Sequence, residues 1–209
     1  MSIKIIGAGL AGCEAAWQAA NLGADVILCE MKPQKRSAAH KSNNFAELVC
    51  SNSLRADGIL NAVGLLKEEM RRMDSLIMQC ADATKVPAGG ALAVDRDGFS
   101  EMVTQKIRKC PNITVTTGEI TSINTDEYTR IAAGPLASDG ISDEISRLTG
   151  EEYLHFYDAA APIVSADSID MTKAFCAARY GKGGADSRRI HRVLERTYLC
   201  RSRTDTRGR

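Results

Sequence analysis

The sequence predicts an α/β protein, and three consecutive features near its start carry that prediction. Ile3, Ile5 and Ile6 are β-branched, and a segment of this kind is typical of a short buried strand. A glycine-rich turn and a helical pattern follow, and residues 25–30 then read as a second apolar strand. Strand, turn, helix and strand in this order make up the βαβ unit of a parallel sheet.

The glycine-rich turn matches a dinucleotide-binding fingerprint. Gly7, Gly9 and Gly12 form the pattern G-x-G-x-x-G in front of a helix expected over residues 12–22. The first glycine allows a tight turn, the second lets the backbone approach a pyrophosphate, and the third brings helix and strand together. The helix N-terminus adds free N–H groups and partial positive charge. We therefore expect cofactor contacts from the whole turn: Gly7, Ala8, Gly9, Leu10, Ala11 and Gly12.

Glu30 ends the second strand, 18 residues after Gly12. A carboxylate at this position of the unit accepts hydrogen bonds from the ribose of an adenine dinucleotide. The strands, the glycine turn, the helix and Glu30 together predict a Rossmann-like domain with such a cofactor. The alternative is a tight βα turn that needs glycine and binds no ligand.

The elements expected after residue 30 begin with a long loop and a long helix. The loop covers residues 31–58 and lacks periodicity, and long loops in compact folds are usually functional. The helix is expected over residues 61–82. Its inner face is predicted to hold Val63, Leu66, Met70, Met73 and Ile77. Its outer face is predicted to hold Lys67, Glu68, Arg71 and Arg72.

Shorter elements are expected further along the chain. A turn leads into a strand within residues 86–94, and an amphipathic helix follows over residues 99–107. Strands are then expected at residues 113–117, 120–124 and 128–133. A helix over residues 142–148, stopped by Gly150, an extended segment at 153–164 and a short helix at 172–179 complete the pattern.

The strand at residues 128–133 ends in Ala-Ala followed by Gly134 and Pro135. In many flavoproteins such a strand returns to the dinucleotide and lays a small residue and a glycine against the cofactor. With the opening motif, this ending favours FAD over NAD, and Gly134 joins the candidate cofactor-binding residues.

Composition places the chain among globular proteins of one or two domains, with 209 residues, 44% of them hydrophobic and 25% charged. No run of 18 apolar residues predicts a membrane span, and the chain starts on a core strand, so we expect a cytoplasmic location. The seven cysteines are odd in number and show no zinc spacing, which predicts reduced thiols and no metal site. Cys29 and Cys80 fit small core residues.

Cys50 is the candidate for nucleophilic chemistry. It lies in the segment 45–54 among small polar residues, with Arg55 adjacent. Nucleophilic cysteines react as thiolates, which nearby cations and helix N-termini stabilise. The residues alone leave open whether Cys50 is reactive or inert.

Six blocks of sequence carry a resemblance to a known family. They cover residues 7–17, 45–55, 61–72, 86–96, 133–136 and 156–164. In the same order, these blocks resemble the folate- and FAD-dependent tRNA uracil-5-methyltransferases, the TrmFO family. The resemblance runs from about residue 3 to about residue 184 and covers less than half of a typical member.

The resemblance implies a specific reaction. In this family FAD is reduced by NADPH or NADH, methylenetetrahydrofolate gives a one-carbon unit, and reduced flavin supplies the electrons that make it a methyl group. The acceptor is C5 of a T-loop uridine in tRNA. Family members carry a cysteine at the position of Cys50 close to the flavin, which implies a catalytic role for Cys50. Whether it attacks uracil, holds an intermediate or acts as an acid or base stays open.

The chain departs from the family after about residue 184. We therefore expect a partial FAD-binding domain over residues 1–184, incomplete on its C-terminal side, and an unassigned tail over residues 185–209. The tail holds eight Arg and three acidic residues, a net charge of +5, against −4 for the remainder. It is either an Arg-rich RNA-binding arm or an out-of-frame product, and the mid-domain position of the change favours the latter.

Two alternatives to the methyltransferase remain. One is a catalytically inactive dinucleotide-binding fragment. The other is a related flavoprotein that modifies the wobble uridine of tRNA, although the blocks at residues 50–54 and 86–92 fit that enzyme poorly. The tRNA partner itself rests on the resemblance alone.

Overall fold

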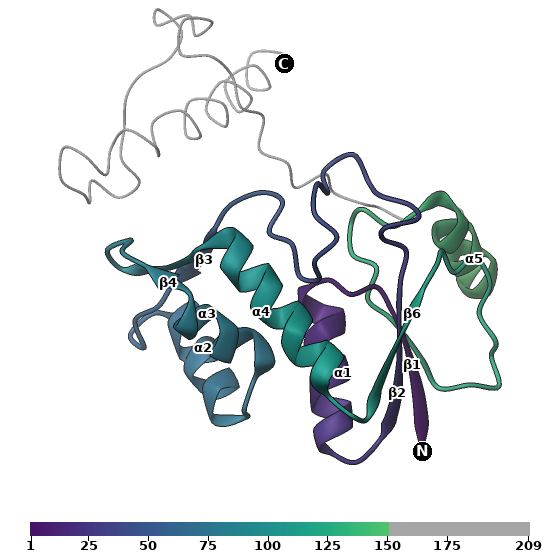
Figure 1. Cartoon of the computed structure of the whole chain (residues 1–209), viewed down its shortest axis with the longest axis horizontal. Helices are drawn as coiled ribbons and strands as arrows, with labels where there is room; N and C mark the ends of the chain where they lie inside the picture. Colours follow the sequence, from purple (N-terminus) through teal and green to yellow (C-terminus); the bar gives the residue numbers. More distant parts are fainter. Residues whose placement is uncertain (151–209) are drawn as a thin grey trace, which may run out of the picture. The chain divides into compact units, whose positions relative to one another are not determined.

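The computed structural model describes residues 1–150, and Figure 1 shows their arrangement. Several expectations concern later residues and lie outside this part of the chain: the segment 153–164 with its family block, the helix at 172–179 and the division at residue 184. Within the described residues, helices and strands alternate broadly as the sequence predicts.

A four-stranded parallel sheet forms the centre of the described fold, in the order β6-β2-β1-β7. Its strands are β1 (Ser2–Ile6), β2 (Asp25–Glu30), β6 (Ile113–Thr117) and β7 (Thr129–Ile131). Ile5 lies beside Leu28, and Leu28 beside Val115, in register. Neighbouring strands of this sheet run parallel, so their carboxyl ends meet at one edge. The arrangement confirms the predicted α/β class.

Helices cover the sheet on both sides (Figure 1). Helices α1 (Leu10–Asn21) and α4 (Arg96–Lys109) lie on one side of the strands, and α5 (Asp139–Thr149) lies on the other. Helix α1 buries only small residues against its neighbours: Gly12, Cys13, Ala16 and Ala20. Short side chains bring the α1 backbone close to β1 and β2, as a glycine-rich βα turn requires. Helix α1 begins two residues earlier than predicted, with Gly9 as its N-cap.

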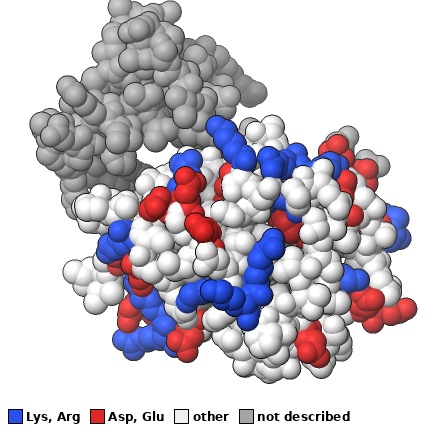
Figure 2. Space-filling view, in the orientation of Figure 1, with Lys and Arg blue, Asp and Glu red and all other residues white. Residues whose placement is uncertain are grey.

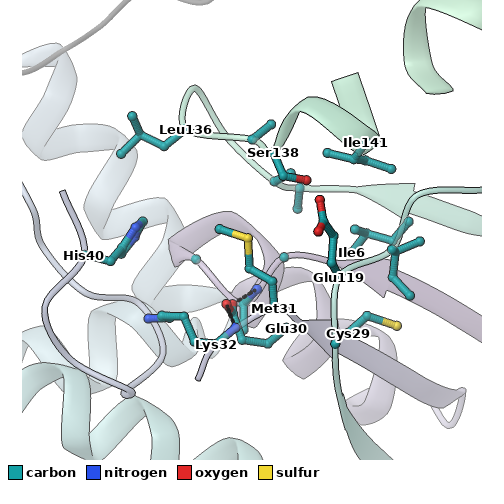
Figure 3. Close-up of a pocket in the computed structure, with 18 of the residues that line it drawn as sticks. Ile6, Cys29, Glu30, Met31, Lys32, His40, Glu119, Leu136, Ser138 and Ile141 are labelled. Atoms are coloured by element: carbon teal, nitrogen blue, oxygen red, sulfur yellow. Dashed lines mark hydrogen bonds between the residues drawn. The ribbon is translucent and has the colours of Figure 1, made fainter. Parts of the chain in front are cut away.

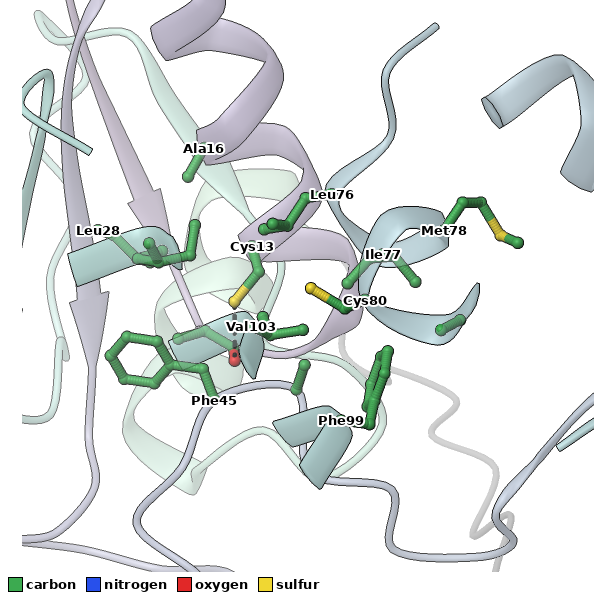
Figure 4. Packing of buried hydrophobic residues seen from close by; sticks show 14 of the residues in the cluster. Cys13, Ala16, Leu28, Phe45, Leu76, Ile77, Met78, Cys80, Phe99 and Val103 are labelled. Carbon is green, nitrogen blue, oxygen red and sulfur yellow. Dashed lines mark hydrogen bonds between the residues drawn. The ribbon is translucent and has the colours of Figure 1, made fainter. Parts of the chain in front are cut away.

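The hydrophobic core lies between the sheet and the helices α1, α3 and α4. Figure 4 shows Leu28 from β2, Leu76 from α3 and Val103 from α4 around the two thiols of Cys13 and Cys80. Both cysteines are fully buried, and burial raises the pKa of the Cys80 thiol to about 11 and that of Cys13 further. The buried positions of Cys80 and Cys29 confirm the prediction that these two residues belong to the core.

A small antiparallel sheet stands beside the main one. Its strand order is β3-β5-β4, with β3 (Ser53–Ala56), β5 (Ala91–Val94) and β4 (Lys85–Val86). The strand predicted within residues 86–94 is thus confirmed, whereas β3 lies in the segment that was predicted as loop. Asn52 fixes the start of β3, since its backbone oxygen accepts a bond from the Val94 N–H and its side chain donates to the Val94 oxygen.

The single helix predicted over residues 61–82 is wrong, because the chain forms two helices there. They are α2 (Ala62–Arg72) and α3 (Leu76–Ala83). Asp74 takes a left-handed conformation with φ of 52° and ends the first helix. Ser75 then caps the second, and its hydroxyl accepts a bond from the Met78 N–H. Continuous helical periodicity in the sequence does not reveal such a break.

The predicted inner face of this region is also wrong in part. Leu66 and Met73 are 55% and 63% exposed, whereas Lys67 is buried. Gly64 lies so close to Gly58 that a Cβ would stand 2.0 Å from the Gly58 oxygen, so this side of α2 faces inward. Lys67, one turn further, reaches the Ala56 oxygen at 2.9 Å with its ammonium group. Its burial lowers the pKa of Lys67.

The segment after β6 differs from prediction as well. The strand expected at residues 120–124 does not form, because Glu144 of α5 accepts the Ile123 N–H at 2.8 Å in place of a sheet partner. The helix that follows is confirmed, and it ends as predicted at Gly150, whose φ is 73°. In residues 1–150, helices are too short or too polar to cross a bilayer.

Candidate functional site

A pocket opens at the carboxyl ends of the parallel strands (Figure 3). The chain segments that leave β1, β2, β6 and β7 all contribute to its lining, together with part of the loop at residues 40–47. The volume of the pocket is about 640 Å³, which includes the part of it that is open to solvent. This edge of a parallel sheet is where α/β proteins bind ligands.

Two of the three motif glycines are required by the protein itself. Gly7 has a φ of 101°, and a Cβ on it would lie 2.7 Å from the Ala132 oxygen. A Cβ on Gly12 would lie 1.8 Å from the Gly7 oxygen. Each approach is shorter than any contact a real Cβ atom makes, so these positions accept no side chain without movement of the backbone.

Gly9 lies in a different environment. Its φ of −75° suits any residue, and a Cβ added to it would meet no protein atom within 4 Å. Gly9 lines the pocket, so the open space above it belongs to the pocket and not to the packed interior. A glycine that the fold does not need, facing a cavity, fits a backbone that a ligand approaches closely.

The N-terminus of α1 is open to an anion. Gly9 is its N-cap and carries no capping side chain, and its first turn contains no acidic residue. The leading N–H groups of a helix have no intrahelical acceptor and carry partial positive charge. Leu10, Ala11 and Gly12 were also predicted to contact the cofactor, but they do not line the pocket. Any contact that they make with a ligand would therefore come from their backbone N–H groups.

Glu30 links the turn to the second strand. One carboxylate oxygen accepts the Ala8 N–H at 2.9 Å, and the other accepts the Lys32 N–H at 3.0 Å. Ala8 and Glu30 both line the pocket, and Glu30 is 7% exposed. Each oxygen keeps a second lone pair, which leaves acceptor capacity for hydroxyl groups of a ligand.

The segment after β7 contributes small residues to one wall of the pocket. Ala132 donates its N–H to the Ile6 oxygen at 2.8 Å, and both Ala132 and Ala133 line the pocket. Gly134, with a φ of 70°, does not line it. In the Ala-Ala-Gly-Pro ending the two alanines line the pocket, and a cofactor contact by Gly134 stays a prediction.

The long loop after β2 contributes pocket residues that belong to no sequence motif. Lys32 and His40 lie on one side of the pocket in Figure 3, and Ala46 and Glu47 also line it. Ala46 donates its N–H to the Ala8 oxygen at 2.9 Å, which fastens the loop to the glycine turn. Burial and the nearby Lys32 charge lower the pKa of His40. The unusual length of the loop was the one available signal.

Cys50 is not part of the pocket lining. Cys50 is exposed and lies four residues beyond Ala46. It belongs to the short stretch between the buried Leu48 and Asn52, whose side chain bonds Val94 of β5. Its position outside the core agrees with the prediction of a polar loop. Among residues 1–150, no group of three or more His, Cys, Asp or Glu is placed to hold a metal ion.

The model of the family described as "Glucose inhibited division protein A" matches residues 2–207. The chain is 60% identical over 184 residues to proteins named "Methylenetetrahydrofolate--tRNA-(uracil-5-)-methyltransferase TrmFO" from Pelotomaculum thermopropionicum and Acetivibrio thermocellus. A relative of the same name from Listeria monocytogenes is 58% identical. Each alignment covers 88% of this chain and 42% of the relative, so the chain spans about two fifths of their length.

Among solved structures, that of FqzB aligns with a TM-score of 0.41 at 17% identity, over 72% of this chain and 39% of that one. A similarity of this size supports no argument about the pocket.

Proposed function

The chain belongs to the glucose inhibited division protein A family, and on that premise we propose that its pocket binds FAD for folate-dependent methylation of tRNA uridine at C5. The observation that carries the proposal is the open space above Gly9, next to the uncapped N-terminus of α1. A pyrophosphate needs such a cradle, in which backbone N–H groups and a helix N-terminus meet without an intervening side chain.

Each part of the pocket has a proposed task. Gly9 and the first N–H groups of α1 hold the pyrophosphate, and Glu30 accepts hydrogen bonds from the ribose. Gly7 and Gly12 keep the turn tight enough to present these groups. When bound, FAD supplies the electrons that reduce a one-carbon unit to a methyl group. Methylenetetrahydrofolate as donor is part of the proposal and is supported by the printed names of the relatives. NADPH or NADH as reductant is part of the proposal on the sequence resemblance alone.

Cys50 is the proposed catalytic thiol. Uracil C5 is a poor nucleophile until a group adds at C6, and a thiolate is suited to that addition. Its exposed position leaves the thiol accessible to a macromolecular substrate such as tRNA. On the face shown in Figure 2, basic and acidic side chains are interspersed, so that face offers no continuous basic surface for RNA.

A dinucleotide-binding module without catalysis is the second candidate. The observation that favours it is the absence of Cys50 from the described pocket lining, since a catalytic thiol must reach the reacting atoms. The two candidates share the FAD site and differ in whether methyl transfer follows.

The experiment that separates them uses a chimera. Residues 1–184 of this chain replace the matching segment of the Listeria monocytogenes relative, and the purified chimera is incubated with tRNA, FAD, NADPH and methylenetetrahydrofolate. We expect 5-methyluridine in the T-loop, measured by mass spectrometry of the digested tRNA. The unaltered relative is the control for substrate quality. A chimera that binds FAD and leaves tRNA unmethylated supports the binding module instead.

The role of Glu30 can be tested in the 209-residue chain. We expect Glu30→Ala to weaken FAD binding by about 1–3 kcal/mol, because a charged acceptor for ribose hydroxyls is lost. Isothermal titration of FAD measures the change. Glu30 also holds the N–H groups of Ala8 and Lys32, so a modest drop in melting temperature should accompany it. Unchanged affinity together with a lower melting temperature would restrict Glu30 to its structural bonds.

A further inference from the structure

Lys32 is a buried cation in the wall of the pocket. Its side chain is 4% exposed, and it is the only Lys or Arg among the described residues that line the pocket. Its ammonium donates to the Asn44 oxygen at 2.5 Å, and the nearest carboxylate oxygen, on Glu47, lies 3.8 Å away. An ammonium has three donors, and one of these contacts lies at hydrogen-bond length. Lys32 thus retains donor capacity inside the pocket.

The other charged side chains that line the pocket have hydrogen-bond partners of their own, and none of them accepts from Lys32 at hydrogen-bond length. Both oxygens of Glu30 already accept backbone N–H groups. Glu119, on the far side of the pocket in Figure 3, pairs with Lys35 at 2.8 Å. His40 lies beside Lys32, and its lowered pKa favours the neutral ring at neutral pH. Glu47 accepts the N–H groups of Lys41 and Ser42, so its carboxylate is shared among several donors.

We propose that Lys32 binds a phosphate group of the dinucleotide directly and thereby selects phosphorylated ligands over the bare nucleoside. The proposal rests on the proposed function, because it takes the pocket to be a dinucleotide site. Two sources of positive potential meet in this pocket, the ammonium of Lys32 and the uncapped N-terminus of α1 beside Gly9. A buried ammonium with spare donors gains most from an oxyanion, since charge-assisted bonds are strongest away from water.

A purely structural role makes a different prediction. Through the Asn44 oxygen and Glu47, Lys32 also holds the segment 44–47 near the glycine turn. If holding this segment were its whole role, removal of the ammonium would weaken every ligand of the pocket alike. A phosphate contact weakens only ligands that carry phosphate.

The test compares ADP and adenosine on the full 209-residue chain. Their dissociation constants are measured by NMR titration for the unaltered chain, Lys32→Met and Lys32→Arg. We expect Lys32→Met to raise the constant for ADP about tenfold or more, and the constant for adenosine less than about twofold. Lys32→Arg should recover most of the ADP affinity, because it keeps the cation. The ADP affinity of the unaltered chain should fall more steeply with salt than that of Lys32→Met.

Lys85→Met is the matched control, since Lys85 pairs with Asp57 and does not line the pocket. It should leave both constants unchanged. Equal loss of ADP and adenosine in Lys32→Met would overturn the phosphate contact in favour of the structural role, and no loss of either would overturn both. An unaltered chain that binds neither ADP nor FAD would overturn the proposed dinucleotide site itself, and this proposal with it.

Discussion

Replacing Gly9 with valine should abolish FAD binding while the chain remains folded. The valine side chain would extend into the open space above Gly9, where no protein atom lies within 4 Å of a Cβ, so it would displace no packed group. Its cost to the fold is limited to the weaker N-cap that valine gives α1. The same side chain would block the approach of the pyrophosphate to the backbone, so FAD binding should be lost. We expect no detectable saturation in an FAD titration and a circular dichroism spectrum like that of the unaltered chain.

Gly12→Val is the matched control for this prediction. Its Cβ would lie 1.8 Å from the Gly7 oxygen, so helix α1 and the turn must separate. We expect this variant to lose the native fold, or to melt far below the unaltered chain, along with any FAD binding. Near-normal FAD affinity in Gly9→Val would contradict the assignment of the pyrophosphate site, whatever the behaviour of Gly12→Val.

The βαβ unit was predictable because its physics is local. β-Branched residues around Ile5, the glycine turn and the small residues of α1 each favour the same structure within some 30 residues. The strand at β6 and the helix α5 were found for the same reason, through short-range pattern and the stop at Gly150. Gly7, Ala8, Gly9 and Glu30 follow from this unit, and they do line one pocket.

The remaining pocket residues depend on contacts between distant segments. Ala46 reaches Ala8 across 38 positions, and Lys32 and Glu47 meet because the intervening loop folds back on the glycine turn. No periodicity marks such a loop, so its length was predictable and its contacts were not. The prediction that Lys67 lies on the outer face of α2 was wrong for a related reason. A lysine is expected at the surface from sequence alone, and its burial depends on the Ala56 carbonyl, 11 residues away, which accepts a hydrogen bond from its ammonium.

Cys50 illustrates both what the sequence predicts and what it does not. Sequence resemblance points to the residue, and long-range contacts determine where it lies. On one side Ala46 is bonded to Ala8 of the glycine turn, and on the other Asn52 is paired with Val94 of β5. The thiol therefore lies on a short exposed stretch between two anchored residues, one of which is bonded to the glycine turn. This is a position from which a thiol can serve chemistry without supporting the core.

Because Cys50 is exposed, its removal separates an effect on catalysis from an effect on folding. In the chimera described above, Cys50→Ala should lower methyl transfer to tRNA by orders of magnitude, while FAD affinity and melting temperature stay close to those of the unaltered chimera. Cys80→Ala is the matched control, because Cys80 is fully buried among core residues of α3. It should lower the melting temperature and keep most of the activity per folded molecule. Full methyl transfer by Cys50→Ala would remove this thiol from the mechanism and leave it an exposed loop residue.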